Sequence, residues 1–195
     1  MDFEKASNYI LNKIEYETDE NLFYHNLEHT LDVYQSAIQI AEKEKTGEHE
    51  LILLKTACLY HDSGMLLDYR KHEEMSCKLA RESLPGYGYS DREIESVSTM
   101  IMSTKLPQDA SSFLEKIICD ADLDYLGRDD FFMIAHRLRL EWIRLGVKNF
   151  SLKEWYVSQI EFLQSHAYFT PTAKKNRNDG KQRNLEMIQE ILGKE

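Results

Sequence analysis

The sequence predicts an all-α protein, and three observations support this fold class. Apolar residues recur at spacings of three and four along most of the chain, which is the helical period. The 195 residues include only eight Gly and three Pro, fewer turn residues than a many-stranded sandwich needs. No segment shows the strong alternation of apolar and polar residues that marks a half-buried strand. A chain of this length builds one good core, so we expect a single compact domain over residues 1–195.

The first three expected helices differ in how deeply they should be buried. Residues 3–16 and 29–45 each place apolar side chains near one face. The next stretch, LILLKTACLY (51–60), is apolar nearly all round, which indicates a central buried helix. Gly64 is well placed to stop it. Further helices are expected at about 72–83, 91–103, 112–119, 129–145, 151–165 and 181–192.

Two capping boxes and three polar stretches complete this outline. Ser90 with Glu93, and Ser151 with Glu154, have the spacing of a capping box at a helix start. We expect loops at 84–90, 105–112 and 170–181. The last of these is almost devoid of apolar anchors, which makes it a candidate mobile segment before the final helix.

Composition narrows the classes of partner and compartment. The formal net charge of −10 disfavours nucleic acid polymers as partners, because phosphate backbones attract cationic surfaces. A small phosphorylated substrate stays compatible, since a bound divalent cation supplies local positive charge. Neither a membrane-spanning apolar run nor a secretory signal is visible, so we expect no membrane partner. Three isolated Cys indicate a reduced, cytoplasmic protein, and monomer and homodimer stay open.

Two histidines open the segment YHNLEHTLDV. His25 and His29 stand four residues apart at an expected helix start, where such side chains share one face. Asp32, three residues after His29, could orient the ring of a ligating histidine. Helices also place such pairs by chance, so this spacing alone is a weak signal for a metal site.

A His-Asp pair follows the most apolar predicted helix. His61 and Asp62 would point about 100° apart on a helix, so both reach one ion only if it lies beyond the helix end. The segment HDSG puts them there. An ionised Asp62 at a buried helix end needs a partner, and a metal ion is a natural one.

The third acidic element is ICDADLDYLG (118–127). Asp120, Asp122 and Asp124 alternate after the apolar segment FLEKII, so at least one carboxylate should reach the core. The alternative is that Asp120 caps a following helix while the other two are solvated. Two imidazoles and two carboxylates would form an octahedral site for Mn, Fe, Mg, Co or Ni. The absence of a cysteine ligand disfavours a structural zinc site.

The order H…HD…D resembles the HD-domain metal phosphohydrolases. It is read here as His29, His61-Asp62 and Asp122, and the resemblance covers roughly residues 20–170. The segment DADLDYLG, followed by RLEW (139–142), is similar to a small bacterial branch described as predicted metal-dependent HD phosphohydrolases. This resemblance implies the all-α HD/phosphodiesterase fold, with Asp122 as the metal ligand and Asp120 beside it. The C-terminal basic segment and helix (171–195) would follow that core.

YHNLEHTLDV is also similar to the Y-H-N-x-x-H-x-x-D-V motif of class I cyclic-nucleotide phosphodiesterases. That resemblance implies that His25 is the proton donor and His29 a metal ligand. Two-metal members of the superfamily carry two further histidines between HD and the last Asp. His72 could be one of them, but MIMSTKLP (100–107), where the other would fall, has none.

We therefore expect a metal-dependent phosphohydrolase acting on a phosphomonoester or phosphodiester of a nucleotide or other small molecule. Asp122 or Asp120 could accept the proton of a metal-activated water, and His25 could protonate the leaving oxygen. Glu73 could hold a metal-bound water or, with His72, a second ion, or it could simply begin a helix with favourable charge. Two other functions stay open: a mixed-valent di-iron oxygenase, and a non-catalytic sensor of metal or nucleotide.

Several cations are candidates for binding phosphate, although a surface salt bridge is the commoner role for any one of them. They are Lys105, Arg128, Arg137, Arg139, Arg144, Lys174, Lys175 and Arg177. Residues 174–183 carry five cations against one Asp and could close as a lid over an anionic substrate. A solvated turn before the last helix is the plainer interpretation.

Overall fold

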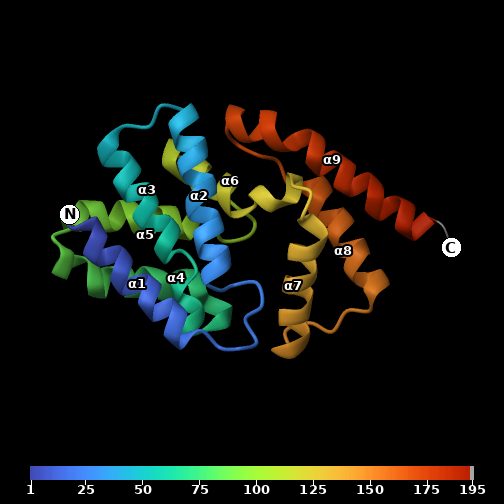
Figure 1. Ribbon diagram of the computed structural model, residues 1–195, viewed down its shortest axis with the longest axis horizontal. Coiled ribbons are helices and arrows are strands. Elements are labelled where there is room, and N and C mark those ends of the chain that lie inside the picture. The colour runs from blue at the N-terminus through green and yellow to red at the C-terminus, as the bar shows by residue number, and fades with distance from the viewer. Residues whose placement is uncertain (194–195) are drawn as a thin grey trace. The chain divides into compact units, whose positions relative to one another are not determined.

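The computed structural model describes residues 1–193, and its regular structure is helical (Figure 1). No strand occurs among these residues, so the predicted all-α class is confirmed. The helices are α1 (Phe3–Glu17), α2 (Leu27–Lys43), α3 (Glu48–Tyr60), α4 (His72–Ser83), α5 (Asp91–Ser103), α6 (Phe113–Asp122), α7 (Phe131–Arg144), α8 (Leu152–Ser165) and α9 (Pro171–Gly193). Four short 3-10 helices join some of them: η1 (Ser63–Leu66), η2 (Tyr69–Lys71), η3 (Leu84–Tyr87) and η4 (Asp124–Gly127).

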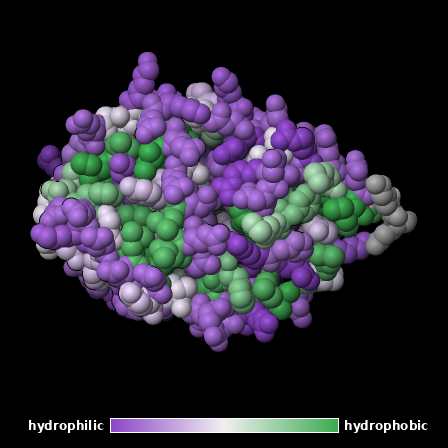
Figure 2. Space-filling model, viewed as in Figure 1, coloured by the Kyte–Doolittle hydropathy of each residue, from purple (hydrophilic) through white to green (hydrophobic). Residues whose placement is uncertain are grey.

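The described chain divides into two compact units. Residues 1–20 and 25–122 form the first unit, and residues 21–24 and 123–193 lie in the second. The single domain expected over residues 1–195 stays a prediction. No helix among the described residues is long and apolar enough to cross a membrane. Figure 2 shows hydrophobic residues as separate patches within a mostly hydrophilic visible face.

The first unit is built around α3. This helix packs against α1, α2, α5 and α6, and α2 also packs along α6. Nearly all of its last eight residues are buried, which confirms the prediction from LILLKTACLY. The largest fully buried side chains of this unit are Tyr60, Ile10, Leu54, Leu84, Met100, Ile101, Ile117 and Ile118. These apolar contacts fix the helices that present the polar residues described below.

Gly64 has a different role from the one predicted. The helix α3 ends at Tyr60 with His61 as its C-cap, and Gly64 lies beyond it in η1. A Cβ atom on Gly64 would meet the backbone oxygen of His72 at 2.0 Å and the backbone nitrogen of Ser76 at 2.5 Å. Glycine is therefore required because η1 packs directly on the backbone of α4.

The second unit packs α7, α8 and α9 around an aromatic core. Its buried members are Tyr24, Leu123, Tyr125, Leu126, Phe131, Ile134, Ala135, Trp155, Leu163 and Ile188. Within the unit, a Cβ atom on Gly180 of α9 would meet the oxygen of Gly127 at 1.9 Å, so α9 and η4 touch backbone to backbone. The fully buried carboxylate of Glu141 accepts a hydrogen bond from the backbone N–H of Tyr24 at 2.8 Å.

The predicted loop at 170–181 is wrong. Helix α9 begins at Pro171 and includes the whole basic segment. Proline suits the first turn because its missing N–H is not needed there. The apolar periodicity starts late, so the sequence pattern hid the first ten residues of the helix. By contrast, both capping boxes are confirmed, at Ser90 and at Ser151.

Candidate metal centre

His29 is held in the first turn of α2 by a helix cap. The side chain of Asn26 accepts hydrogen bonds from the backbone N–H groups of Glu28 and His29, so α2 begins immediately after it. His25 therefore precedes the cap and is not in the helix, which corrects the expectation that His25 and His29 share a helical face. The turn still brings their rings together, with centroids 6.0 Å apart and planes nearly perpendicular.

His61 is oriented by the end of α3. Its Nδ1 lies 2.8 Å from the backbone oxygen of Cys58, an unsatisfied carbonyl of the last helical turn. The carbonyl can only accept, so Nδ1 carries a proton and donates it. In the neutral ring, the lone pair then resides on Nε2, which points into the cluster. This is the usual arrangement for a metal-ligating histidine.

The predicted metal ligands converge on one point in the first unit. His29 Nε2 lies 3.4 Å from His61 Nε2 and 3.3 Å from both Asp62 Oδ2 and Asp122 Oδ1. His61 Nε2 lies 3.1 Å from Asp62 Oδ2 and 3.7 Å from Asp122 Oδ1. Ligand atoms of His29, His61 and Asp122 all lie within 4.8 Å of one another, a group that could hold a metal ion.

Burial and the neighbouring charges act in opposite directions on the pKa values of this cluster. Burial, the largest influence, would by itself lower the pKa of His29 and His61, but Asp62 and Asp122 raise both above the ordinary value of 6.5. Burial would raise the pKa of the two carboxyls, but the histidines hold that of Asp62 well below 3.8 and lower that of Asp122 to about 2. The site thus attracts positive charge, whether as protons or as a metal ion.

The second oxygen of Asp62 faces another pair of residues. His72 Nε2 lies 3.5 Å from Asp62 Oδ1 and 3.4 Å from Glu73 Oε1. His72 Nδ1 lies 3.1 Å from the backbone oxygen of Tyr69. Glu73 is only 6% exposed, so the interpretation of this residue as a solvated helix start is wrong.

His25 borders the cluster beside Tyr69. Its ring centroid is 5.8 Å from that of Tyr69 and 5.9 Å from that of His72. Asp32 is half-buried, one turn after His29 on α2. The structure thus gathers His25, His72 and Glu73 around the four predicted ligands.

In DADLD, Asp120 and Asp124 are buried and Asp122 is half-buried, so the alternative of solvated carboxylates is wrong. Asp120 and Asp124 are 0% and 4% exposed, and the side chain of Asp122 is 15% exposed. Asp122 is the last residue of α6 and belongs to the cluster. In the second unit, Asp124 accepts two hydrogen bonds from Arg177, at 2.6 and 2.8 Å.

Several of the predicted phosphate-binding cations have protein partners. Lys105 pairs with Glu74 at 2.6 Å, and Arg139 donates to the backbone oxygen of Phe150 at 2.6 Å. Arg177 is paired with Asp124, as described above. Lys174 and Lys175 are exposed on α9. Because they lie on a regular helix, the basis for a mobile lid is lost, and their phosphate role stays a prediction.

Sequence reasoning missed the residues that orient the site. Tyr69 adjoins His25, the carbonyl of Cys58 orients His61, and Ser76 accepts a hydrogen bond from the N–H of Gly64 at 2.8 Å. Gly64 was the one sequence feature that marked these contacts, because a glycine at this position allows close backbone packing. A carbonyl group carries no sequence signature at all.

The donor set fits a divalent ion. Because Nδ1 of His61 donates to the carbonyl of Cys58, Nε2 is the atom that can ligate, and it faces a second imidazole and two carboxylates. Such a set requires positive charge at its centre, from protons or from a metal ion that displaces them. Two nitrogens and two oxygens would leave coordination positions for water and substrate, as in N/O sites for Mn, Fe, Co, Ni or Mg.

Fold and site together define an all-helical protein with a His/His/Asp cluster that could hold a metal. The HD domain model matches residues 26–124, about half of the chain. The chain therefore belongs to the HD domain family.

The chain is similar in sequence to an uncharacterized relative and in fold to solved structures. An uncharacterized protein of Clostridium beijerinckii is 35% identical over 97 residues, which are 48% of this chain and 61% of that protein. The chain thus spans less than two thirds of the length of this relative. A predicted HD superfamily hydrolase from an uncultured Thermotogales bacterium is 24% identical, with a TM-score of 0.62 over 98% of this chain and 91% of that one. Bacillus subtilis YpgQ, solved in complex with ADP, is 17% identical, with a TM-score of 0.67 over 97% and 95%.

Proposed function

We propose that this chain is a metal-dependent phosphohydrolase acting on a phosphate ester of a nucleotide or another small molecule. The observation that carries the proposal is the convergence of His29, His61, Asp62 and Asp122 on one buried point. Family membership supports it, and so does the ADP bound to the structural relative YpgQ. When bound, a divalent ion would supply Lewis acidity towards a phosphoryl oxygen and would lower the pKa of water.

The protein's own groups would handle the protons. His25 lies beside the cluster and is proposed to donate a proton to the leaving oxygen. Glu73, Asp122 and Asp120 are the candidates to accept a proton from the attacking water. Glu73 is favoured over Asp122, because Asp122 is paired with two imidazoles and its pKa is held at about 2, which makes it a weak base.

The carbonyl of Cys58 would support this chemistry without touching the substrate. By accepting the Nδ1 proton it keeps His61 in the tautomer that a metal ligand needs. His72 would position Asp62 and Glu73, since its Nε2 lies near both carboxylates. That His72 and Glu73 hold a second ion stays a prediction.

Metal analysis and a substrate panel would test the proposal together. The purified chain should contain close to one equivalent of Mn, Fe, Co, Ni or Mg, and chelation should remove its hydrolysis of nucleotides, cyclic nucleotides or simple phosphate esters. Oxygen consumption with a bound iron pair would instead support an oxygenase. Tight metal or nucleotide binding with no turnover of any substrate would support a sensor. Either result would overturn the hydrolase.

A further inference from the structure

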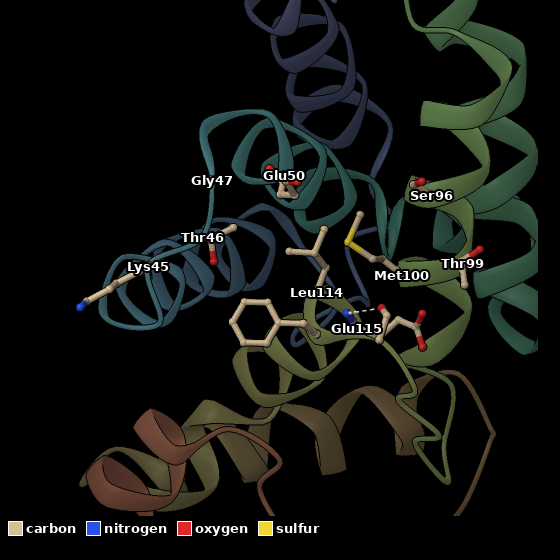
Figure 3. A pocket seen from close by; sticks show the side chains of 11 residues that line it. Lys45, Thr46, Gly47, Glu50, Ser96, Thr99, Met100, Leu114 and Glu115 are labelled. Carbon is tan, nitrogen blue, oxygen red and sulfur yellow. Dashed lines mark hydrogen bonds between the residues drawn. The ribbon is translucent and has the colours of Figure 1, made fainter.

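A pocket lies in the first unit, away from the metal centre. Its volume is about 590 Å³, which is within the range of small-molecule sites. The turn at residues 45–47, the start of α3, the middle of α5 and the start of α6 line it (Figure 3).

The pocket occupies the opposite ends of the helices that carry the proposed metal ligands. Helix α3 begins beside the pocket and ends next to His61, and α6 begins beside it and ends at Asp122. At a rise of 1.5 Å per residue, these helices are about 20 and 15 Å long. A small ligand in the pocket would therefore leave the metal centre open.

One part of the pocket is apolar. In Figure 3 the side chains of Met100 and Leu114 lie near the middle of the view, and Phe113 also lines the pocket. Met100 is 2% exposed, and Phe113 is 45% exposed. These side chains would contact a flat or branched hydrocarbon body and remove it from water.

The polar part of the pocket offers acceptors. The hydroxyls of Ser96 and Thr99 donate their hydrogens to backbone oxygens of the preceding helical turn, at 3.0 and 2.9 Å, which leaves their lone pairs available. Ser112 Oγ already accepts from the N–H of Glu115. Thr46 Oγ1 is buried and is not exposed to the pocket, so the acceptors of this part are the hydroxyls of Ser96 and Thr99.

The charge of the lining is negative. Glu115 is 6% exposed, and its Oε2 accepts two hydrogen bonds from Ser111, which keep its pKa low despite burial. Glu50 adds a second carboxylate. Among the lining residues, all of them described, Lys45 alone is cationic, and its side chain extends away from the apolar group in Figure 3. Phosphate is thus disfavoured here, and a cationic donor is favoured.

We propose that this pocket binds a small organic cation with an apolar or aromatic body and a protonated amine. The apolar side chains would cover the body, while the hydroxyl lone pairs and the carboxylates would accept from the ammonium group. The proposal is independent of the hydrolase activity, because it concerns other residues and a ligand of opposite charge.

Phenethylamine is a suitable probe, with phenylacetate as an anion of similar shape. Binding to the full chain is measured by NMR titration in excess Mg²⁺, so that the metal centre is occupied by a competing cation. Phenethylamine should shift the methyl resonances of Thr46, Met100 and Leu114, and phenylacetate should not. Equal binding of the two compounds would overturn the proposal. So would shifts confined to the residues around His29 and His61.

A matched pair of variants tests the location. Thr99→Lys puts a positive charge at the pocket, and Ser165→Lys puts one on α8, at another exposed hydroxyl that donates to its own helix. Like charge should weaken phenethylamine binding roughly tenfold or more in Thr99→Lys and leave it unchanged in Ser165→Lys. Phe113→Ala should weaken binding about threefold through lost apolar contact. Unchanged affinity in both pocket variants would assign the amine to another site.

Discussion

Two aspartates separated by one residue show how differently the same side chain is used. Asp122 ends α6 in the first unit, and Asp124 begins η4 in the second. Both side chains are mostly buried, at 15% and 6% exposed. Asp122 faces the imidazoles of His29 and His61, whereas Asp124 accepts two hydrogen bonds from the guanidinium of Arg177.

The partner decides the role. A guanidinium is always charged, and its fork satisfies both oxygens of Asp124, so this pair is a fixed structural contact. An imidazole can lose its proton and then offers a lone pair to a metal ion. Asp122 therefore belongs to a cluster that could exchange protons for a metal, while Asp124 ties η4 to α9.

The largest expected effect is a difference in bound metal between variants of Asp122 and of Asp124. Asp122→Ala should lower metal affinity by more than about 100-fold, because even residues that only orient a ligand typically contribute 10–100-fold. Asp124→Ala and Asp120→Ala should lower it far less. Bound metal is measured by elemental analysis after dialysis, with His29→Ala and His61→Ala as further variants that should lose metal. Equal metal in Asp122→Ala and the parent would refute the assignment.

His25 should matter for rate and not for metal content. His25→Ala is expected to retain the ion and to lose about 10²-fold in turnover, the usual scale for a general acid. Turnover and metal are measured on the same preparation. Loss of the ion in this variant would mean that His25 is a ligand.

The Asp124–Arg177 pair should contribute to stability alone. Breaking it with Asp124→Ala or Arg177→Ala should lower the free energy of unfolding by about 1–3 kcal/mol, less than for a fully buried pair because Arg177 is 28% exposed. Denaturant titration of both single variants and the double variant measures the coupling. Strictly additive losses would show that the pair is not a unit.

Gly64 links backbone packing to the cluster. Gly64→Ala should destabilise the protein by about 1–3 kcal/mol and weaken metal binding, since the new methyl meets backbone atoms of α4. Gly86→Ala is the matched control, because nothing lies within 4 Å of a Cβ atom there, and it should change stability by less than about 0.5 kcal/mol. Similar stability and metal affinity in the two variants would contradict the close contact.

Metal affinity should rise with pH. The pKa values of His29 and His61 are raised above 6.5, so both rings hold protons that an entering ion must displace. As pH decreases below the raised pKa values, metal affinity should therefore fall by up to about tenfold per pH unit for each protonated ring. Calorimetric titration with Mn²⁺ at several pH values, corrected for buffer ionisation, measures this slope. An affinity independent of pH would place the ion elsewhere.

The same shifts set the stability of the metal-free protein. Because the pKa values of His29 and His61 are raised on folding, the protonated rings stabilise the fold, and this contribution is complete below about pH 6.5. It is lost as pH rises through the higher pKa values of the folded state. The ionised carboxylate of Asp122 likewise stabilises the fold above about pH 3.8, because its pKa is lowered on folding. This contribution is lost as pH falls through about 2. Metal-free stability should therefore be greatest between about pH 4 and 6.5, and added Mn²⁺ should stabilise more at higher pH.

The sequence alone predicted the helices and the cluster members, because both depend on local patterns. Helices at 72–83 and 91–103 match the structure, since periodicity and the box at Ser90 mark their ends. The order H…HD…D identified the four residues that converge. It did not find the first half of α9, because a polar helix stabilised by contacts such as Gly180 with Gly127 has no apolar period there.

The tertiary structure decided which partner each polar group has. Within the first unit, it set the carbonyl of Cys58 against His61 and brought His72 and Glu73 to the second oxygen of Asp62. In the second unit, it paired Arg177 with Asp124. These contacts join residues by their place in the fold, and one of the partners, the carbonyl of Cys58, is a backbone group that has no side-chain signature. Residue types can therefore be read from the sequence, but the charge that each one faces depends on packing.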